Sequence, residues 1–361
     1  MCSALRNKFT GPCLLFRANV AVIFLAAFAL AGCDKKQDSN SAPITTATPY
    51  TLVVPPGFPP PYINPENPMT VEGVQLGEML YSDPILSSNG RSCSSCHERS
   101  KSYSLQLFVK SSGDLTSIPP HVNLAFAPRF LWNGKQTVLD KIGIADFGPY
   151  FFNTNKDSLY ARLARHPVYP GLLKIAFGIS NVYEMNYDTL QKKLVFAISN
   201  YIRTLVSARS KFDLYRQHKA TLTQEEYTGM VIFNTEKGDC FHCHGEPLFS
   251  DHLFHNIGLD SVYSSAWQKG QSAWTNNPED DGKWHTSTLR NIQFTAPYMH
   301  DGRFKTLEEV IDFYDHGVKI TSTTDPIMLK PAKKYGLGLN PYEKQCLIAF
   351  LGALSDTTFS K

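Results

Sequence analysis

Two short stretches of the sequence carry residue types that can bind a redox cofactor. Residues 93–97 read Cys-Ser-Ser-Cys-His, and residues 240–244 read Cys-Phe-His-Cys-His. Both have the Cys-x-x-Cys-His spacing at which haem c attaches to a protein. The two thiols form thioether bonds to haem vinyl groups, and the histidine becomes the proximal ligand of the iron. The predicted haem-binding residues are therefore Cys93, Cys96 and His97 in the first motif and Cys240, Cys243 and His244 in the second.

Two other uses of paired cysteines fit the sequence less well. A zinc ribbon places its cysteine pairs roughly 15–20 residues apart, whereas these two pairs are far more widely separated. A thioredoxin-like dithiol needs no histidine after its second cysteine and lies beside a βαβ pattern, which this sequence lacks. Metal binding and dithiol chemistry are the alternatives to two covalent haems.

The composition is that of an ordinary globular protein. The chain has 361 residues, of which 42% are hydrophobic and 19% charged, and this length suggests about two domains at roughly 150 residues each. The net charge of +3 is too small to indicate a nucleic-acid partner, and no basic patch is interleaved with aromatic residues. We therefore expect no binding to nucleic acid.

The first 33 residues have the features of an export signal. Basic residues precede an apolar run from Ala18 to Ala31, which is shorter than the roughly 20 residues that span a bilayer as a helix. Residues 30–33, Leu-Ala-Gly-Cys, resemble a bacterial lipobox, which implies cleavage before Cys33 and lipid on its thiol. An uncleaved anchor or a plain secretory signal is the alternative. Attachment of haem c is typical of the bacterial periplasmic side. We therefore expect the protein to lie on that side, anchored to the membrane.

The apolar pattern predicts a mainly α-helical protein: two cytochrome c-like haem domains with long loops and little sheet. Helical spacing begins after Thr70, is broken at Asp83, and returns at residues 156–165 and 187–207. Thr223 and Glu226 form a capping box that predicts a helix towards Phe233, and residues 341–354 predict a closing helix. The predicted divisions are a signal at 1–33, a tether and Pro-rich segment at 34–69, an N-terminal haem domain at 70–215 and a C-terminal haem domain at 216–361.

One cysteine has no assigned role after export, lipidation and haem attachment. Cys346 lies within an apolar stretch near the C-terminus, so we expect a buried, unreactive thiol. The sequence therefore contains no disulfide framework.

Several further stretches resemble the bacterial di-haem cytochrome c peroxidase and MauG family. They are residues 76–87, 123–134, 243–251 and 288–304, and the likeness runs over about residues 55–354. The resemblance implies that hydrogen peroxide is reduced at the N-terminal haem with electrons relayed through the C-terminal haem. It implies an electron source that is either a small redox donor, such as a c-type cytochrome or a cupredoxin, or a protein side chain that becomes oxidised.

The same resemblance implies roles for two aromatic residues. Trp132 matches the tryptophan that lies between the two haems of the family, so it is expected to relay electrons; packing between the domains is the alternative. Tyr314 matches the position of the second haem's sixth ligand, which is tyrosine in MauG-like members. Met299 is the rival ligand. An anionic oxygen ligand would lower the potential of the iron relative to a thioether.

The sequence departs from the family around the first haem. The histidine that blocks the iron in many of these peroxidases is replaced by Gly113, and the nearby histidine is His121. An open first haem is therefore expected.

The family's distal glutamate is also absent, because Phe151 occupies its position. Loss of a general acid–base group typically costs about 10²–10⁴-fold in rate. Asp146 or Asp157 would take its place only with a shift of the loop. A non-catalytic electron-transfer or sensing lipoprotein is therefore the alternative function.

The resemblance also implies an inter-domain calcium ion. Thr295 and Pro297 match two of its ligands, whereas Ser117 stands at the position of an asparagine ligand. Oxygen ligands suit calcium, but this set is small without water.

Overall fold

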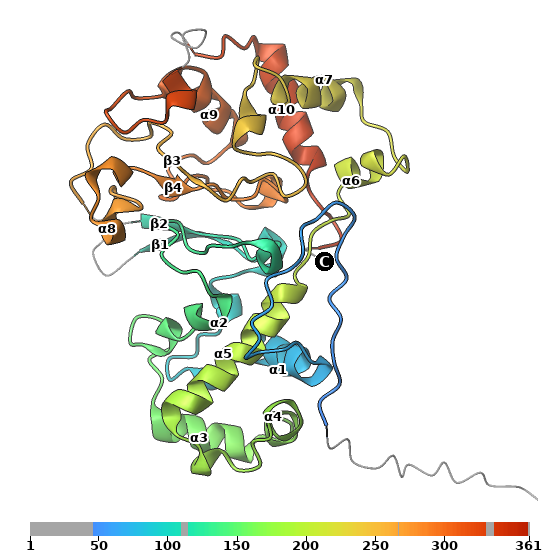
Figure 1. Cartoon of the computed structure of the whole chain (residues 1–361), viewed down its shortest axis with the longest axis vertical. Helices are drawn as coiled ribbons and strands as arrows, with labels where there is room; N and C mark the ends of the chain where they lie inside the picture. Colours follow the sequence, from blue (N-terminus) through green and yellow to red (C-terminus); the bar gives the residue numbers. More distant parts are fainter. Residues whose placement is uncertain (1–45, 110–114, 266, 330–335, 360–361) are drawn as a thin grey trace, which may run out of the picture. The chain divides into compact units, whose positions relative to one another are not determined.

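The structure is a computed structural model that describes residues 46–109, 115–265, 267–329 and 336–359. Residues 44–361 form one compact unit, and its described residues are mainly helical with two small two-stranded antiparallel sheets (Figure 1). The predicted fold class is thereby confirmed. The export signal and the lipid site at Cys33 lie outside the described residues. No helix in the described ranges is both long enough and apolar enough to cross a membrane.

Short helices and two small two-stranded sheets make up most of the regular structure in the described residues. The α-helices are α1 (Val71–Ser82), α2 (Leu139–Ile142), α3 (Lys156–Arg165), α4 (Tyr169–Phe177), α5 (Tyr187–Thr204), α6 (Lys211–Arg216), α7 (Gln224–Phe233), α8 (Ser272–Thr275), α9 (Leu307–Asp312) and α10 (Pro341–Ala353). The strand β1 (Leu105–Val109) pairs with β2 (Leu115–Ile118), and β3 (Phe254–His255) pairs with β4 (Trp284–His285). The helices predicted after Thr70, over 156–165, after Thr223 and near the C-terminus are confirmed, whereas α5 ends three residues before the predicted limit.

The first hydrophobic core is built on the crossing of α1 and α5, which lie side by side in Figure 1. Its buried residues run from Leu76 to Leu205, and Cys93 packs against it. The two helices approach most closely at Gly77, where an added Cβ would lie 1.9 Å from the carbonyl oxygen of Ala197. Only glycine permits such an approach of one backbone to another.

The second core repeats this arrangement with α7 and α10. Its buried residues run from Phe212 to Leu354, and Cys240 packs against it. Here the close approach is at Gly229, where a Cβ would lie 1.9 Å from the carbonyl oxygen of Cys346. Cys346 is fully buried, as predicted. Each core therefore supports one haem motif, while the domain boundary at residues 215–216 stays a prediction.

A buried ion pair fixes α2 against α5. The Arg203 guanidinium donates hydrogen bonds to both carboxylate oxygens of Asp140, and both side chains are almost completely buried. Asn67 also donates to Asp140 and to the carbonyl oxygen of Phe196. Removing one partner of such a pair leaves an uncompensated buried charge. The pair therefore holds the start of the segment 139–152, which forms one wall of the first haem cavity.

We expect Gly229→Ala to lower the free energy of unfolding by about 1–3 kcal/mol, because the new methyl group must push α7 away from α10. Gly171→Ala in α4 is the matched control, because its Cβ would meet nothing within 4 Å; it should be neutral or stabilising by about 0.5–1 kcal/mol. Denaturant unfolding of the two haem-loaded variants measures both effects. Equal stability of the two variants would contradict the close helix approach.

Candidate haem sites

The two haem-motif histidines are oriented by the same kind of hydrogen bond. His97 Nδ1 donates to the carbonyl oxygen of Tyr103 at 2.8 Å, and His244 Nδ1 donates to that of Phe249 at 2.9 Å. Burial lowers the pKa of His97 to about 4 and also lowers the pKa of His244. Both rings are therefore neutral at pH 7, with Nε2 left for a metal. A neutral imidazole held through Nδ1 is the form that ligates iron.

Each motif lines a cavity. The first cavity, of about 270 Å³, is lined by Cys93, Cys96 and His97. The second, of about 730 Å³, is lined by Cys240, Cys243 and His244. Burial raises the pKa of the Cys93 and Cys96 thiols and raises that of Cys240 to about 12. A largely apolar cavity with two thiols and one free imidazole nitrogen fits haem c in both places.

Trp132 lines both cavities. Its indole N–H donates to the carbonyl oxygen of Ser117 in β2 at 2.7 Å. Its own carbonyl oxygen accepts from the backbone N–H of His285 in β4 at 2.9 Å. Contacts with β2 and β4 thus hold Trp132 at the boundary between the two cavities. Its role as an electron relay stays a prediction.

The second cavity contains both candidate sixth ligands. Tyr314 lies in a π-helical turn, Phe313–Gly317, that continues α9, and π-turns are frequent at functional sites. Burial raises the pKa of its phenol, and the nearby thiols of Cys243 and Cys240 add to the shift. Met299 lines the same cavity, with a left-handed backbone φ of 68°. Ligation by Tyr314 or by Met299 is therefore geometrically open in this cavity.

His121 lies against the proximal histidine of the first site. Its ring stacks on that of His97 with centroids 3.6 Å apart, and its Nδ1 hydrogen-bonds the Tyr81 hydroxyl at 3.1 Å. Two imidazoles that ligate one iron from opposite sides point their nitrogens at each other, whereas these two rings lie face to face. This arrangement supports the expectation of an open first haem. Gly113 lies outside the described residues.

Tyr103, whose carbonyl orients His97, is packed by two further aromatic rings. The ring of Phe359 packs edge-on against Tyr103, with centroids 5.5 Å apart. Tyr81 of α1 also packs edge-on against Tyr103. The residue that orients His97 is therefore held between α1 and the last described residue, Phe359.

Residues 139–152 supply a separate wall of the first cavity. Phe151, assigned to the family's glutamate position, lines the cavity, and so does Asp146. Asp157, the other acid considered, is exposed in the first turn of α3. A carboxylate is thus present in the cavity although its predicted position is occupied by phenylalanine.

The residues proposed for calcium lie close together but are already hydrogen-bonded. The Ser117 hydroxyl donates to the carbonyl oxygen of Pro297 at 3.4 Å. The Thr295 hydroxyl donates to the carbonyl oxygen of Ile292 at 3.2 Å. All three of Ser117, Thr295 and Pro297 line the second cavity. Calcium binding here stays a prediction.

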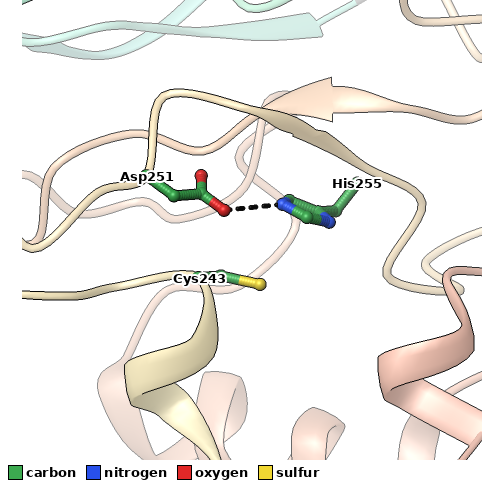
Figure 2. Close-up of side chains that lie close together, drawn as sticks. All are labelled: Cys243, Asp251 and His255. Atoms are coloured by element: carbon green, nitrogen blue, oxygen red, sulfur yellow. Dashed lines mark hydrogen bonds and ion pairs between the residues drawn. The ribbon is translucent and has the colours of Figure 1, made fainter.

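The sequence interpretation missed a charged cluster behind the second motif (Figure 2). His255 hydrogen-bonds Asp251 through Nε2 at 2.8 Å and Asp325 through Nδ1 at 2.6 Å, with Cys243 alongside. Asp251, then Cys243 and Asp325, raise the pKa of His255 to about 11. A haem thioether at Cys243, which the motif predicts, would leave an imidazolium between two carboxylates in place of a metal site. The Asp-x-x-x-His spacing after the motif was the available signal.

A second missed pair is His252 and His285. Their rings are stacked with centroids 5.5 Å apart, and the Nε2 atoms of both are buried without a hydrogen-bond partner among the described residues. Burial lowers the pKa of both rings, that of His285 to about 4. Both line the first cavity, and His285 also lines the second.

We expect His255→Gln to lower stability in a pH-dependent way. Asp251 and Asp325 remain beside His255 when Cys243 is a thioether, so the folded pKa of His255 stays raised. Its contribution is therefore fully present below its unfolded pKa of about 6.5 and is lost as pH rises through the raised folded pKa. The loss should be about 1.5–3 kcal/mol at pH 6, as for hydrogen bonds to charged groups, and smaller at pH 10. Denaturant unfolding at both pH values measures it, with exposed His218→Gln as the control. A pH-independent loss would rule out the charged clamp.

Comparison with known proteins gives a consistent family assignment. The model of the family described as di-haem cytochrome c peroxidase matches residues 71–221. The chain is 33% identical over 340 residues to the cytochrome-c peroxidase IdrP1 of Pseudomonas sp. (strain SCT), covering 82% of this chain and 84% of that protein. It is 30% identical over 295 residues to the methylamine utilization protein MauG of Methylorubrum extorquens, covering 80% and 79%. A solved MauG-like protein associated with microbial copper homeostasis superposes with a TM-score of 0.77 at 29% identity, covering 86% of this chain and 97% of that one.

Proposed function

Because the chain belongs to the di-haem cytochrome c peroxidase and MauG family, we propose that it reduces hydrogen peroxide at the haem of His97 with electrons relayed through the haem of His244. It is a di-haem, peroxidase-like oxidoreductase with haem c cofactors. The observation that supports the relay is that Trp132 lines both haem cavities. An aromatic ring that lines both cavities would offer electrons a path between the two haems.

The residues of the two cavities have different proposed roles. When bound, the haems would carry electrons from the donor and provide the site where peroxide is reduced. Tyr103 and Phe249 hold the two haem-motif imidazoles in a fixed orientation through their carbonyl oxygens, and burial keeps both rings neutral. His121 stacks face to face on His97, an orientation in which the two rings would not ligate one iron from opposite sides, so it would leave the first site open. Tyr314 is the proposed oxygen ligand at the second site, where it favours higher oxidation states.

The partners and location form the finer part of the proposal. Electrons come from a small redox donor, such as a c-type cytochrome or cupredoxin, or from a protein side chain that is oxidised, as the MauG-like Tyr314 favours. The protein acts on the periplasmic side, tethered by lipid on Cys33. A calcium ion near Thr295 and Pro297 would link the two haem regions.

A di-haem electron carrier or sensor is the second candidate function. The observation that favours it is Phe151, which lines the first cavity at the family's glutamate position and cannot carry a proton. Such a protein would keep both haems yet react slowly with peroxide.

We expect the diferric and reduced proteins to react rapidly with hydrogen peroxide, because one iron site is open. Stopped-flow absorption at the Soret band measures this. Rapid, defined spectral change that a reductant reverses supports the peroxidase. Slow bleaching in both forms would contradict it and favour the carrier.

We expect Tyr314→Phe to change the low-spin EPR signal of the second haem, because the phenolate ligand is lost. Met299→Leu is the matched control in the same cavity and should leave the signal in place. EPR of the diferric proteins tests both. If Met299→Leu alone removes the low-spin signal, methionine is the ligand and the MauG-like assignment fails.

A further inference from the structure

Asp146 stands out in the first haem cavity. It is the one acidic side chain among the described residues that line this cavity, where it lies with Cys93, Cys96 and His97. Its charge raises the pKa of both cysteine thiols, so its carboxylate lies near both points of haem attachment. Besides those thiols, the other ionisable side chains that line the cavity are Arg91, His97, His121, Arg129, His252 and His285.

The carboxylate of Asp146 has no counter-ion. Within the described residues, no hydrogen bond or ion pair involves its oxygens. The nearby guanidinium groups are occupied elsewhere, since Arg91 donates to the carbonyl oxygen of Tyr150 and Arg129 to that of Gly134. Burial raises the pKa of Asp146 to about 7. An uncompensated acid in an apolar cavity costs stability, and such groups gather at functional sites.

The backbone holds Asp146 firmly. Its N–H donates to the carbonyl oxygen of Gly143 at 3.2 Å, and its carbonyl oxygen accepts from the N–H of Phe152 at 2.8 Å. The next residue, Phe147, is buried and packs edge-on against Phe152. The Asp140–Arg203 ion pair fixes α2 directly upstream. Asp146 thus enters the cavity from a rigid turn on a different segment from the one that holds His97.

We propose that Asp146 is the acid–base residue of the first haem cavity and takes over the function that Phe151 cannot perform. This inference rests on the proposed function. Asp146 accepts a proton from one oxygen of hydrogen peroxide and returns it to the other oxygen, which leaves as water when the O–O bond breaks. The two electrons come from the donor of the proposed function, and a further two protons from solvent convert the remaining oxygen to a second water.

Kinetics with peroxide give the first test. In the haem-loaded protein, Asp146→Asn should slow the initial stopped-flow reaction by about 10²–10⁴-fold, the usual contribution of a general acid–base. Asp146→Glu keeps the acid and should stay within about tenfold of the native rate. Asp157→Asn, an exposed aspartate outside the cavity, is the matched control and should react as the native protein does. Adding Phe151→Glu to Asp146→Asn should recover much of the lost rate.

Cyanide binding gives a readout that does not depend on turnover. Hydrogen cyanide must lose a proton as it binds ferric haem, so its association rate in the native protein should change with pH near neutrality. That dependence should disappear in Asp146→Asn and persist in Asp157→Asn. The haem content of each variant, measured from its pyridine haemochrome spectrum, shows that the site is intact.

The outcomes separate the two proposals. If the native protein reacts with peroxide and Asp146→Asn differs from it by less than about threefold in both assays, the role of Asp146 is overturned. If the native protein does not react with peroxide, the proposed function fails. In that case cyanide binding alone decides: an Asp146-dependent pH profile supports the proton role, and an unchanged profile overturns it.

Discussion

The hydrogen bond from each proximal imidazole to a backbone carbonyl is the interaction on which both sites depend. It fixes the plane of the ring and leaves Nε2 as the metal-binding atom, while burial keeps the ring neutral. Neither carbonyl can lose its place easily, because Tyr103 and Phe249 are buried within aromatic clusters. The rest of each core can be understood as the packing that keeps these carbonyls at about 2.8–2.9 Å from Nδ1.

Both halves of the chain support their haem-motif histidine with equivalent elements. In each half, a helix that precedes the haem motif crosses a later helix at a glycine, so that two backbones touch beside the cavity. An arginine–aspartate pair then fixes a neighbouring segment. In the first half Arg203 pairs with Asp140, and both are buried; in the second half buried Arg290 donates two hydrogen bonds of 2.9 Å to the partly buried Asp213. Paired in this way, the buried charges add directional restraint.

Local signals in the sequence were sufficient for the helices and the haem motifs. The Thr223 capping box and the apolar spacing of α1 act within a few residues, so α1 and α7 could be predicted. The wall formed by residues 139–152 was harder to predict. Counting along this segment assigns one residue to the first cavity, whereas a helical turn and a 3-10 turn bring both Asp146 and Phe151 to it. The His255 clamp was not predictable as a whole, since Asp325 is 70 residues away in the chain.

The contact between Phe359 and Tyr103 has a consequence for the order of synthesis. The N-terminal haem motif, residues 93–97, is synthesised long before Phe359, whose ring packs behind it through Tyr103. A chain truncated just before Phe359 would retain α10 and the packing around the C-terminal haem motif. It would lose packing behind the N-terminal haem motif. The packing behind the N-terminal haem motif is therefore complete only once Phe359 has been added to the chain.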